Sequence, residues 1–177
     1  MNRKHMRGAY TVEFAIVGLL VFTLLFGVVE IGRLYFTVNA LDEAVRRGTR
    51  LAAVCNISDP VILRRAIFNA ATDAGTSQMI GNLATTHLTL TYLDVNGAQV
   101  ANPADTVSAN GFRAIRYVRL SLQNFVFNLF IPGFGVPITL PVFRATLPRE
   151  SLGRHSDSGE ITPVSYTHLT LPTIYSV

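Results

Sequence analysis

The sequence has one cysteine and few charged residues, and each shortage excludes a class of protein. Cys55 is the only cysteine among 177 residues, which excludes an internal disulfide and a metal site built from several cysteines. Its apolar neighbours predict that Cys55 packs as a small hydrophobic side chain rather than reacting as a thiol. Charged residues make up 15% of the chain and apolar residues 49%, a balance that indicates a membrane segment.

The pattern of a nucleic-acid-binding surface is also missing, although the formal net charge is +4. Arg3, Lys4 and Arg7 supply three of the 15 basic residues, so the remainder has 12 basic and 11 acidic residues, a net charge of +1. No stripe of basic residues interleaved with aromatic residues occurs elsewhere in the sequence. We therefore predict that the chain does not bind DNA or RNA.

The sequence lacks the residue combinations that are typical of enzymes. Of the four histidines, only His87 lies within the predicted folded part, and it has no acidic or cysteine neighbour at a spacing typical of metal ligands. The G-x-S-x-G, P-loop and dinucleotide-binding motifs are absent from the sequence as well. The sequence predicts no catalytic activity, no metal site and no cofactor.

A long uncharged run lies near the N-terminus. Residues 14–29 carry no charge, and the apolar stretch reaches Phe36 if Glu30 and Arg33 lie at the membrane interface. About 20 helical residues span the hydrocarbon core of a bilayer, so we predict a transmembrane helix over residues 9–36. Glu30 and Arg33 are three positions apart and are predicted to pair where the helix leaves the membrane. Basic residues precede the run, which predicts a cytoplasmic N-terminus and an extracytoplasmic C-terminal part.

An acidic residue, Glu13, stands at the start of this run. A carboxylate there costs about 2–3 kcal/mol unless it is neutralised or lies near the interface. Glu13 therefore either marks the cytoplasmic boundary or has a function. A cleaved secretory signal is an alternative for the whole segment, but Val38-Asn39-Ala40 is a poor cleavage site and lies beyond the charged pair.

The residues before the run form a motif: a basic leader, a glycine, four residues, Glu-Phe and then the apolar helix, in the sequence RGAYTVEF. This motif resembles the recognition sequence of type IV prepilins and pseudopilins. The resemblance implies that a membrane-embedded prepilin peptidase cuts between Gly8 and Ala9. It also implies that Glu13 and Phe14 serve recognition and docking between subunits, where a new α-amine and a carboxylate of adjacent subunits neutralise each other.

The motif continues as VVEIGRLYF and ALDEAVRRGTRLAAV, and about the first 55 residues resemble the TadE-like proteins of bacterial tight-adherence (Flp) pilus systems. Members of that family are minor pseudopilins, processed like pilins. The resemblance implies a non-enzymatic, single-pass protein of the bacterial inner membrane with a periplasmic domain. The implied partners are the prepilin peptidase, other pilin or pseudopilin subunits and the pilus assembly platform. The alternative is a signal-anchored periplasmic binding or sensor module unrelated to pili.

The rest of the sequence predicts an α+β fold. Helical spacing over residues 41–55 predicts an amphipathic stem whose apolar stripe packs on its own domain or on a partner helix. The stem also has two i,i+4 pairs of favourable order, Asp42–Arg46 and Glu43–Arg47. Asp59 as N-cap, Pro60 in the first turn and Gly75 as the stop signal delimit a second helix.

Alternating apolar residues predict an antiparallel sheet after the helices. The predicted strands and turns are a strand over 88–92, a turn at 96–97, strands over 98–101 and 114–123, a turn at 132–135 and a strand over 138–147. Pro141 indicates that the last strand lies at an edge. The aromatic run of Phe125, Phe127, Phe130 and Phe134 is predicted as domain core, with a partner or membrane-surface patch as the alternative.

The predicted organisation divides the chain as follows: a leader over 1–8, the transmembrane helix over 9–36, the stem and second helix over 37–75, a β-rich part over 76–150, a polar tail over 151–163, and 164–177. Residues 164–173, VSYTHLTLPT, resemble an in-frame translation of adapter sequence from DNA sequencing libraries. Residues 164–177 are therefore interpreted as a sequencing artefact, with a native disordered tail as the alternative.

Overall fold

The structure is a computed structural model that describes residues 3–130 and 137–154, and it has the predicted α+β fold. The helices and strands, in chain order, are α1 (Arg3–Val54), α2 (Pro60–Ala66), β1 (Leu88–Leu93), β2 (Tyr117–Leu122), β3 (Val126–Phe127), β4 (Ile138–Thr139) and β5 (Phe143–Pro148). Two single 3-10 turns, Thr85–His87 and Phe112–Ala114, precede β1 and β2.

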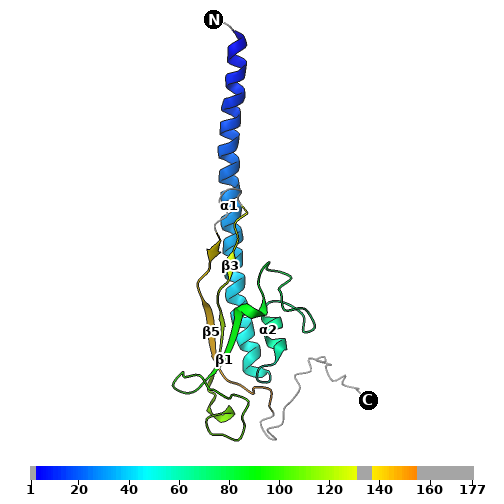
Figure 1. Ribbon diagram of the computed structural model, residues 1–177, viewed down its shortest axis with the longest axis vertical. Coiled ribbons are helices and arrows are strands. Elements are labelled where there is room, and N and C mark those ends of the chain that lie inside the picture. The colour runs from blue at the N-terminus through cyan, green and yellow to red at the C-terminus, as the bar shows by residue number, and fades with distance from the viewer. Residues whose placement is uncertain (1–2, 131–136, 155–177) are drawn as a thin grey trace, which may run out of the picture.

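Helix α1 is the axis of the molecule. It has 52 residues, and at a rise of about 1.5 Å per residue it is about 78 Å long. Its first half stands clear of the rest of the chain, while its second half carries the α+β domain (Figure 1). The helix contains no proline, so no backbone hydrogen bond is lost along its length.

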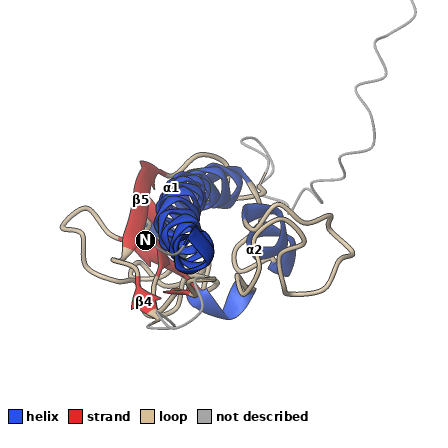
Figure 2. Cartoon of the chain, turned by 90° about the horizontal axis from the view of Figure 1, so that it is seen from above, coloured by secondary structure: helices blue, strands red, loops and turns tan. Residues whose placement is uncertain are grey.

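A three-stranded antiparallel sheet packs against the second half of α1 in the order β1-β2-β5. Viewed along the helix, the sheet lies on one side of α1 and α2 on another (Figure 2). The alternation predicted for β2 is confirmed, because Val118, Leu120 and Leu122 are fully buried while Tyr117 lies exposed on the opposite face. A separate antiparallel pair of strands, β3 with β4, lies next to α1 at the end of the domain that faces the free half of the helix (Figure 1).

The apolar stripe of the stem packs on the chain's own domain, which confirms the first of the two predicted alternatives. The apolar stem residues with a relative exposure of 2% or less are Leu41, Ala44, Val45, Ala52 and Ala53. Three of them, Leu41, Val45 and Ala52, belong to two clusters of buried residues that include side chains of α2, β1 and β2. Two ion pairs were predicted on the stem. Asp42–Arg46 forms, with a nitrogen–oxygen distance of 3.1 Å. In place of the predicted pair with Glu43, the Arg47 guanidinium lies 5.7 Å from the ring centroid of Phe68.

Gly48 lets α1 approach both β2 and α2 closely. A Cβ atom at this position would lie 2.3 Å from Cδ2 of Leu120 and 2.7 Å from Cβ of Ala66. Both distances are far below van der Waals contact, so a side chain at Gly48 would require the Leu120 side chain to rotate and α2 to move away from α1.

The second helix ends earlier than predicted. Asp59 caps α2 as expected, with its Oδ1 accepting a hydrogen bond from Val61 N at 2.9 Å, but the helix stops at Ala66 rather than near Gly75. Phe68 has a φ of 67°, which is incompatible with a right-handed helix. The Asn69 side chain then donates to the carbonyls of Ala74 and Thr76, holding the following segment as a loop.

The predicted strand over 138–147 is two strands. Pro141 lies between β4, which pairs with β3, and β5, which pairs with β2 and forms an edge of the three-stranded sheet. The predicted strand over 98–101 is reduced to a single bridge between Leu93 and Gln99, after a turn in which Gly97 has a φ of 79°. The predicted turn at 132–135, Phe134, the tail beyond residue 154 and the segment 164–177 lie outside the described residues.

Candidate functional site

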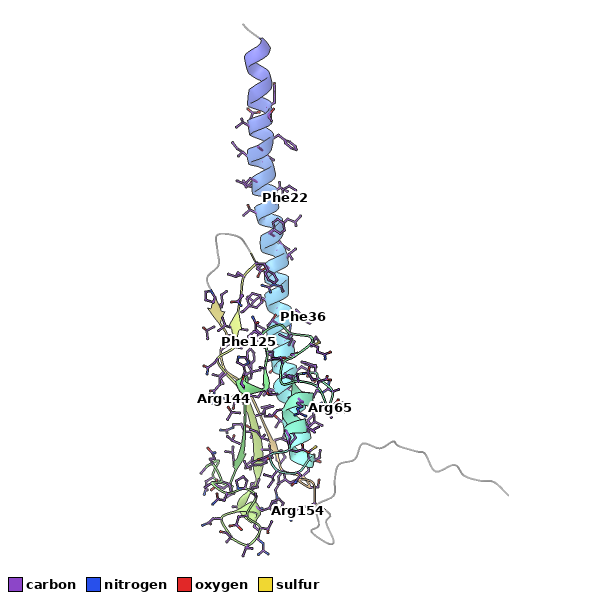
Figure 3. All side chains as sticks on the ribbon, turned by 45° about the vertical axis from the view of Figure 1, so that its right-hand side comes forward. Phe22, Phe36, Arg65, Phe125, Arg144 and Arg154 are labelled. Carbon is purple, nitrogen blue, oxygen red and sulfur yellow. The ribbon has the colours of Figure 1, made fainter. Side chains whose placement is uncertain are left out.

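The free half of α1 exposes apolar side chains in every direction. Figure 3 shows them projecting from the helix, with Phe22 among them, on a stretch that the domain does not reach. Phe14 is 79% exposed and Leu19 is 72% exposed. In the most apolar window of this helix only 6% of the residues are buried, and the helix is long and apolar enough to cross a membrane. In water so large an apolar surface would be strongly unfavourable, so it requires lipid or other helices around it.

The predicted processing and docking residues lie at the start of this surface. Gly8 and Ala9 are within the helical backbone of α1. Glu13 and Phe14 lie a turn or more further along the helix, and both are exposed. The structure of the single chain therefore presents Glu13 to the surroundings of the helix, and its docking role stays a prediction.

Glu30 and Arg33 lie where the domain begins, and they form an ion pair along one turn of α1. Glu30 is only 6% exposed. Its Oε1 accepts hydrogen bonds from the Arg33 guanidinium and from the backbone N–H of Phe130, the latter at 3.3 Å. The carboxylate is thus tied to both α1 and the segment that follows β3.

Arg33 makes the second connection between the same two segments. Its guanidinium donates to the carbonyl oxygen of Asn128 and lies 4.3 Å from the ring centroid of Phe127 and 3.8 Å from that of Phe130. Cation–π contacts of this kind are worth more when they are shielded from water. Glu30, Arg33, Phe127, Asn128 and Phe130 are called the junction clamp below.

The sequence predicted the pairing of Glu30 with Arg33 but not the rest of the junction clamp. The hydrogen bonds from Arg33 to Asn128 and from Phe130 to Glu30 join residues that are 95 and 100 positions apart along the chain. Neither helical spacing nor strand alternation connects residues at such a separation. The only sequence signal was the aromatic run after residue 124, whose members the structure separates: Phe125 and Phe127 are 3% exposed, whereas Phe130 is 74% exposed.

A groove of about 420 Å³ lies beside the junction clamp, between α1 and β3. Arg33 and Phe36 line it from the helix, and Phe125 and Phe130 line it from the β3 side. Figure 3 shows Phe36 and Phe125 near the end of the domain that faces the free half of α1. The groove is therefore located at the level where the exposed apolar helix meets the folded domain.

The remaining candidate residues, Cys55 and His87, make contacts that are typical of residues that stabilise a fold. Cys55 is 6% exposed, and burial, with a smaller contribution from the charge of Asp59, raises the pKa of its thiol. His87 accepts a hydrogen bond at its Nδ1 from Ala84 N at 3.0 Å, and its ring meets that of Phe125 edge-on. Among the described residues no group of three or more His, Cys, Asp or Glu side chains is placed to hold a metal ion.

One exposed apolar helix that carries a folded α+β domain on its second half is the architecture of a single-pass membrane protein. Residues 8–50 match the family model described as TadE-like protein. The resemblance drawn from the sequence is thereby confirmed over that range, and it supports a role associated with tight-adherence pili. The matched range covers Gly8, Glu13, Glu30 and Arg33 and ends within the stem. No curated protein and no solved structure matches the chain.

Proposed function

We propose that the protein is a TadE-like minor pseudopilin, a non-enzymatic component of tight-adherence (Flp-type) pilus assembly, secretion and adhesion. The observation that carries the proposal is the family match over residues 8–50. That range contains the motif from Gly8 to Phe14 and the apolar run of α1 that follows it, whose side chains the domain leaves exposed. Such a helix is suited to lateral packing with the helices of other pilin-like subunits in a membrane.

The proposed location is the bacterial inner membrane, with the N-terminus in the cytoplasm and the α+β domain in the periplasm. The support for this orientation is the cluster of Arg3, Lys4 and Arg7 ahead of the apolar helix. On the other side of the span, Arg33 is paired with Glu30 and so contributes no net positive charge at the membrane exit.

The proposed partners are the prepilin peptidase, which would remove residues 1–8, and neighbouring pilin or pseudopilin subunits with the assembly platform. Gly8 and Ala9 lie in a helical backbone, which a protease must locally unwind to reach the peptide bond. Glycine lowers that cost, because it is less favourable than alanine in a helix by about 1 kcal/mol. A glycine before the scissile bond therefore suits processing on physical grounds.

Mass spectrometry of the mature protein tests the processing step. The chain should be expressed in membranes with its cognate prepilin peptidase, and we expect the purified protein to begin at Ala9. A catalytically inactive peptidase is the matched control and should leave Met1 or Asn2 at the N-terminus. An intact leader in the presence of the active peptidase would remove the pseudopilin proposal.

Glu13→Ala tests the proposed docking role of the acid. We expect the variant to insert into the membrane normally but to reduce pilus assembly strongly, because the carboxylate no longer neutralises an α-amine of the adjacent subunit. Thr23→Ala is the matched control on the same helix, since the Thr23 hydroxyl already donates to the carbonyl of Leu19 at 2.7 Å. Normal piliation of the Glu13 variant would refute the docking role.

A further inference from the structure

The uncharged run of α1 is too short to span a bilayer alone. Residues 14–29 amount to about 24 Å of helix at about 1.5 Å per residue, whereas the hydrocarbon core is about 30 Å thick. If Glu13 lies at one interface, the membrane must extend beyond Val29 at the other end, to the level of Glu30 and Arg33.

The outward face of α1 stays apolar past the charged pair. Ile31 is 58% exposed, Tyr35 is 68% exposed and Phe36 is 55% exposed. The first exposed polar residue on the helix after Glu30 and Arg33 is Asn39. From Phe14 to Phe36 the helix is about 34 Å long, which is sufficient to span the core with a slight tilt.

The junction clamp lowers the free-energy cost of placing the charges of Glu30 and Arg33 in lipid. Glu30 is neutralised by Arg33, and its carboxylate also accepts the N–H of Phe130. The guanidinium in turn is covered by the rings of Phe127 and Phe130. An ion pair is less costly in a medium of low dielectric constant when its partners neutralise each other and make further hydrogen bonds, although the buried Nε of Arg33 has no acceptor among the described residues.

We propose that the end of the domain that carries β3 inserts into the outer leaflet of the bilayer, with Phe130 in contact with lipid. The partner of this surface is the interfacial region of a phospholipid bilayer. Phe130 is 74% exposed although its backbone and ring are fixed to the helix, and Val126 and Ile138 on β3 and β4 add further exposed apolar surface. This patch is continuous with the exposed apolar helix at the level of Phe36 through the shared groove.

This inference goes beyond the pilus role and does not depend on it, since it requires only that α1 spans a membrane. It assigns the membrane boundary to the region of Phe36, and it explains the role of the junction clamp. The clamp holds an aromatic side chain of the domain at a fixed depth beside the helix. The domain would then sit on the lipid surface instead of swinging freely above it.

Tryptophan fluorescence tests the proposal, because the chain contains no tryptophan and each variant carries a single probe. Phe130→Trp keeps an aromatic ring over Arg33. Val107→Trp is the matched control, since Val107 is 88% exposed and belongs to the segment between β1 and β2, whose loops lie at the end of the domain remote from the free half of α1 (Figure 1). Both full-length variants are reconstituted at a low protein-to-lipid ratio in phosphatidylcholine–phosphatidylglycerol vesicles, with and without bromine on the acyl chains.

We expect brominated lipid to quench most of the Phe130→Trp emission, which is also blue-shifted, and aqueous acrylamide to quench the Val107→Trp emission. Quenching of Phe130→Trp by acrylamide but not by brominated lipid overturns the proposal. Protection from both quenchers also overturns it, because a protein surface would then cover this position. Ile138→Trp, on the strand that pairs with β3, provides a second probe of the same surface if Phe130→Trp does not fold, and the same outcomes apply.

Discussion

At the scale of single residues, the Arg33 side chain connects the helix to the domain through several polar and aromatic contacts. It joins an acid on its own helix, a backbone carbonyl beyond β3 and two aromatic rings. Its Nε atom, which is buried in this packing, has no hydrogen-bond acceptor among the described residues. The planar guanidinium can stack and donate at the same time, which an ammonium group cannot do.

Arg33→Lys is therefore expected to destabilise the fold although it keeps the charge. The loss of the stacked guanidinium should lower the free energy of unfolding by about 1–2 kcal/mol. Arg46→Lys is the matched control, because Arg46 also pairs with an acid one turn earlier, Asp42, but on an exposed surface. That change should cost less than about 0.5 kcal/mol.

Chemical unfolding of both full-length variants in detergent, followed by circular dichroism, measures the difference. Equal losses in the two variants would show that the aromatic contacts of Arg33 contribute nothing beyond an ordinary surface ion pair. The two variants are comparable because both substitutions replace arginine with lysine on α1 and neither changes the net charge.

At the scale of elements, the close contact of α1 with β2 and α2 depends on Gly48. Gly48→Ala gains about 1 kcal/mol of helix propensity. The added methyl group would also overlap with Leu120 and with Cβ of Ala66, and overpacking of a core costs about 1–3 kcal/mol. Leu120 can rotate away, but Cβ of Ala66 moves only with α2, so we expect a cost in the upper part of this range, about 2–3 kcal/mol, and after the gain in helix propensity a net loss of about 1–2 kcal/mol.

Gly32→Ala on the same helix is the control for the Gly48 prediction. No atom lies within 4 Å of a Cβ built at Gly32, so only the helix propensity should change and the variant should be neutral or slightly more stable. Thermal unfolding in detergent measures both variants. A Gly48 variant as stable as the Gly32 variant would show that α2 shifts at little cost.

Local patterns predicted those elements whose determinants lie within a few residues. The alternation of β2 and the cap of α2 are of this kind, because each depends on neighbouring residues alone. The end of α2 was not predictable, since it depends on a positive φ at Phe68 and on the hydrogen bonds of Asn69. The split at Pro141 was missed because the two halves pair with different strands, a choice made by tertiary packing.

The same limit applies to the candidate site. The family resemblance and the run of apolar residues predicted the helix, Glu13 and the charged pair from the first 55 residues. The junction clamp requires the segment after β3 to return to α1, and the fold of the domain determines that return. Sequence reasoning placed Phe130 in the domain core together with Phe125, whereas the structure leaves Phe130 exposed beside the helix.

At the scale of the whole molecule, the described residues form a rod that is free at one end and carries its domain along the other (Figure 1). The domain is stabilised by two clusters of buried apolar residues that α1 shares with the sheet. The stem is therefore both the support of the domain and part of its core. A force applied to the membrane helix is transmitted directly into the packed core, because no flexible linker separates the two.

Alkaline pH should weaken this fold through a buried phenol and a buried thiol. Tyr92 is 4% exposed, and burial raises the pKa of its hydroxyl even though that oxygen accepts a hydrogen bond from Ser58 N at 3.0 Å. The unfolded chain then loses the Tyr92 proton at a lower pH than the folded chain. The contribution of Tyr92 is therefore complete below about pH 10, the pKa of tyrosine in an unfolded chain, and is lost as the pH rises through the folded value, whereas the contribution of Cys55 is complete only below about pH 9.

Tyr92→Phe separates these effects, because it removes the titrating group together with the acceptor for Ser58 N. At pH 7 the variant should lose about 1–2 kcal/mol through the unsatisfied N–H. Its further loss between pH 7 and pH 11 should be smaller than that of the original chain, and the residual slope should come from Cys55, whose raised pKa acts in the same direction. Urea midpoints at the two pH values measure this, with the exposed Tyr117→Phe as control. A pH dependence as steep as that of the original chain would show that the alkaline sensitivity does not come from Tyr92.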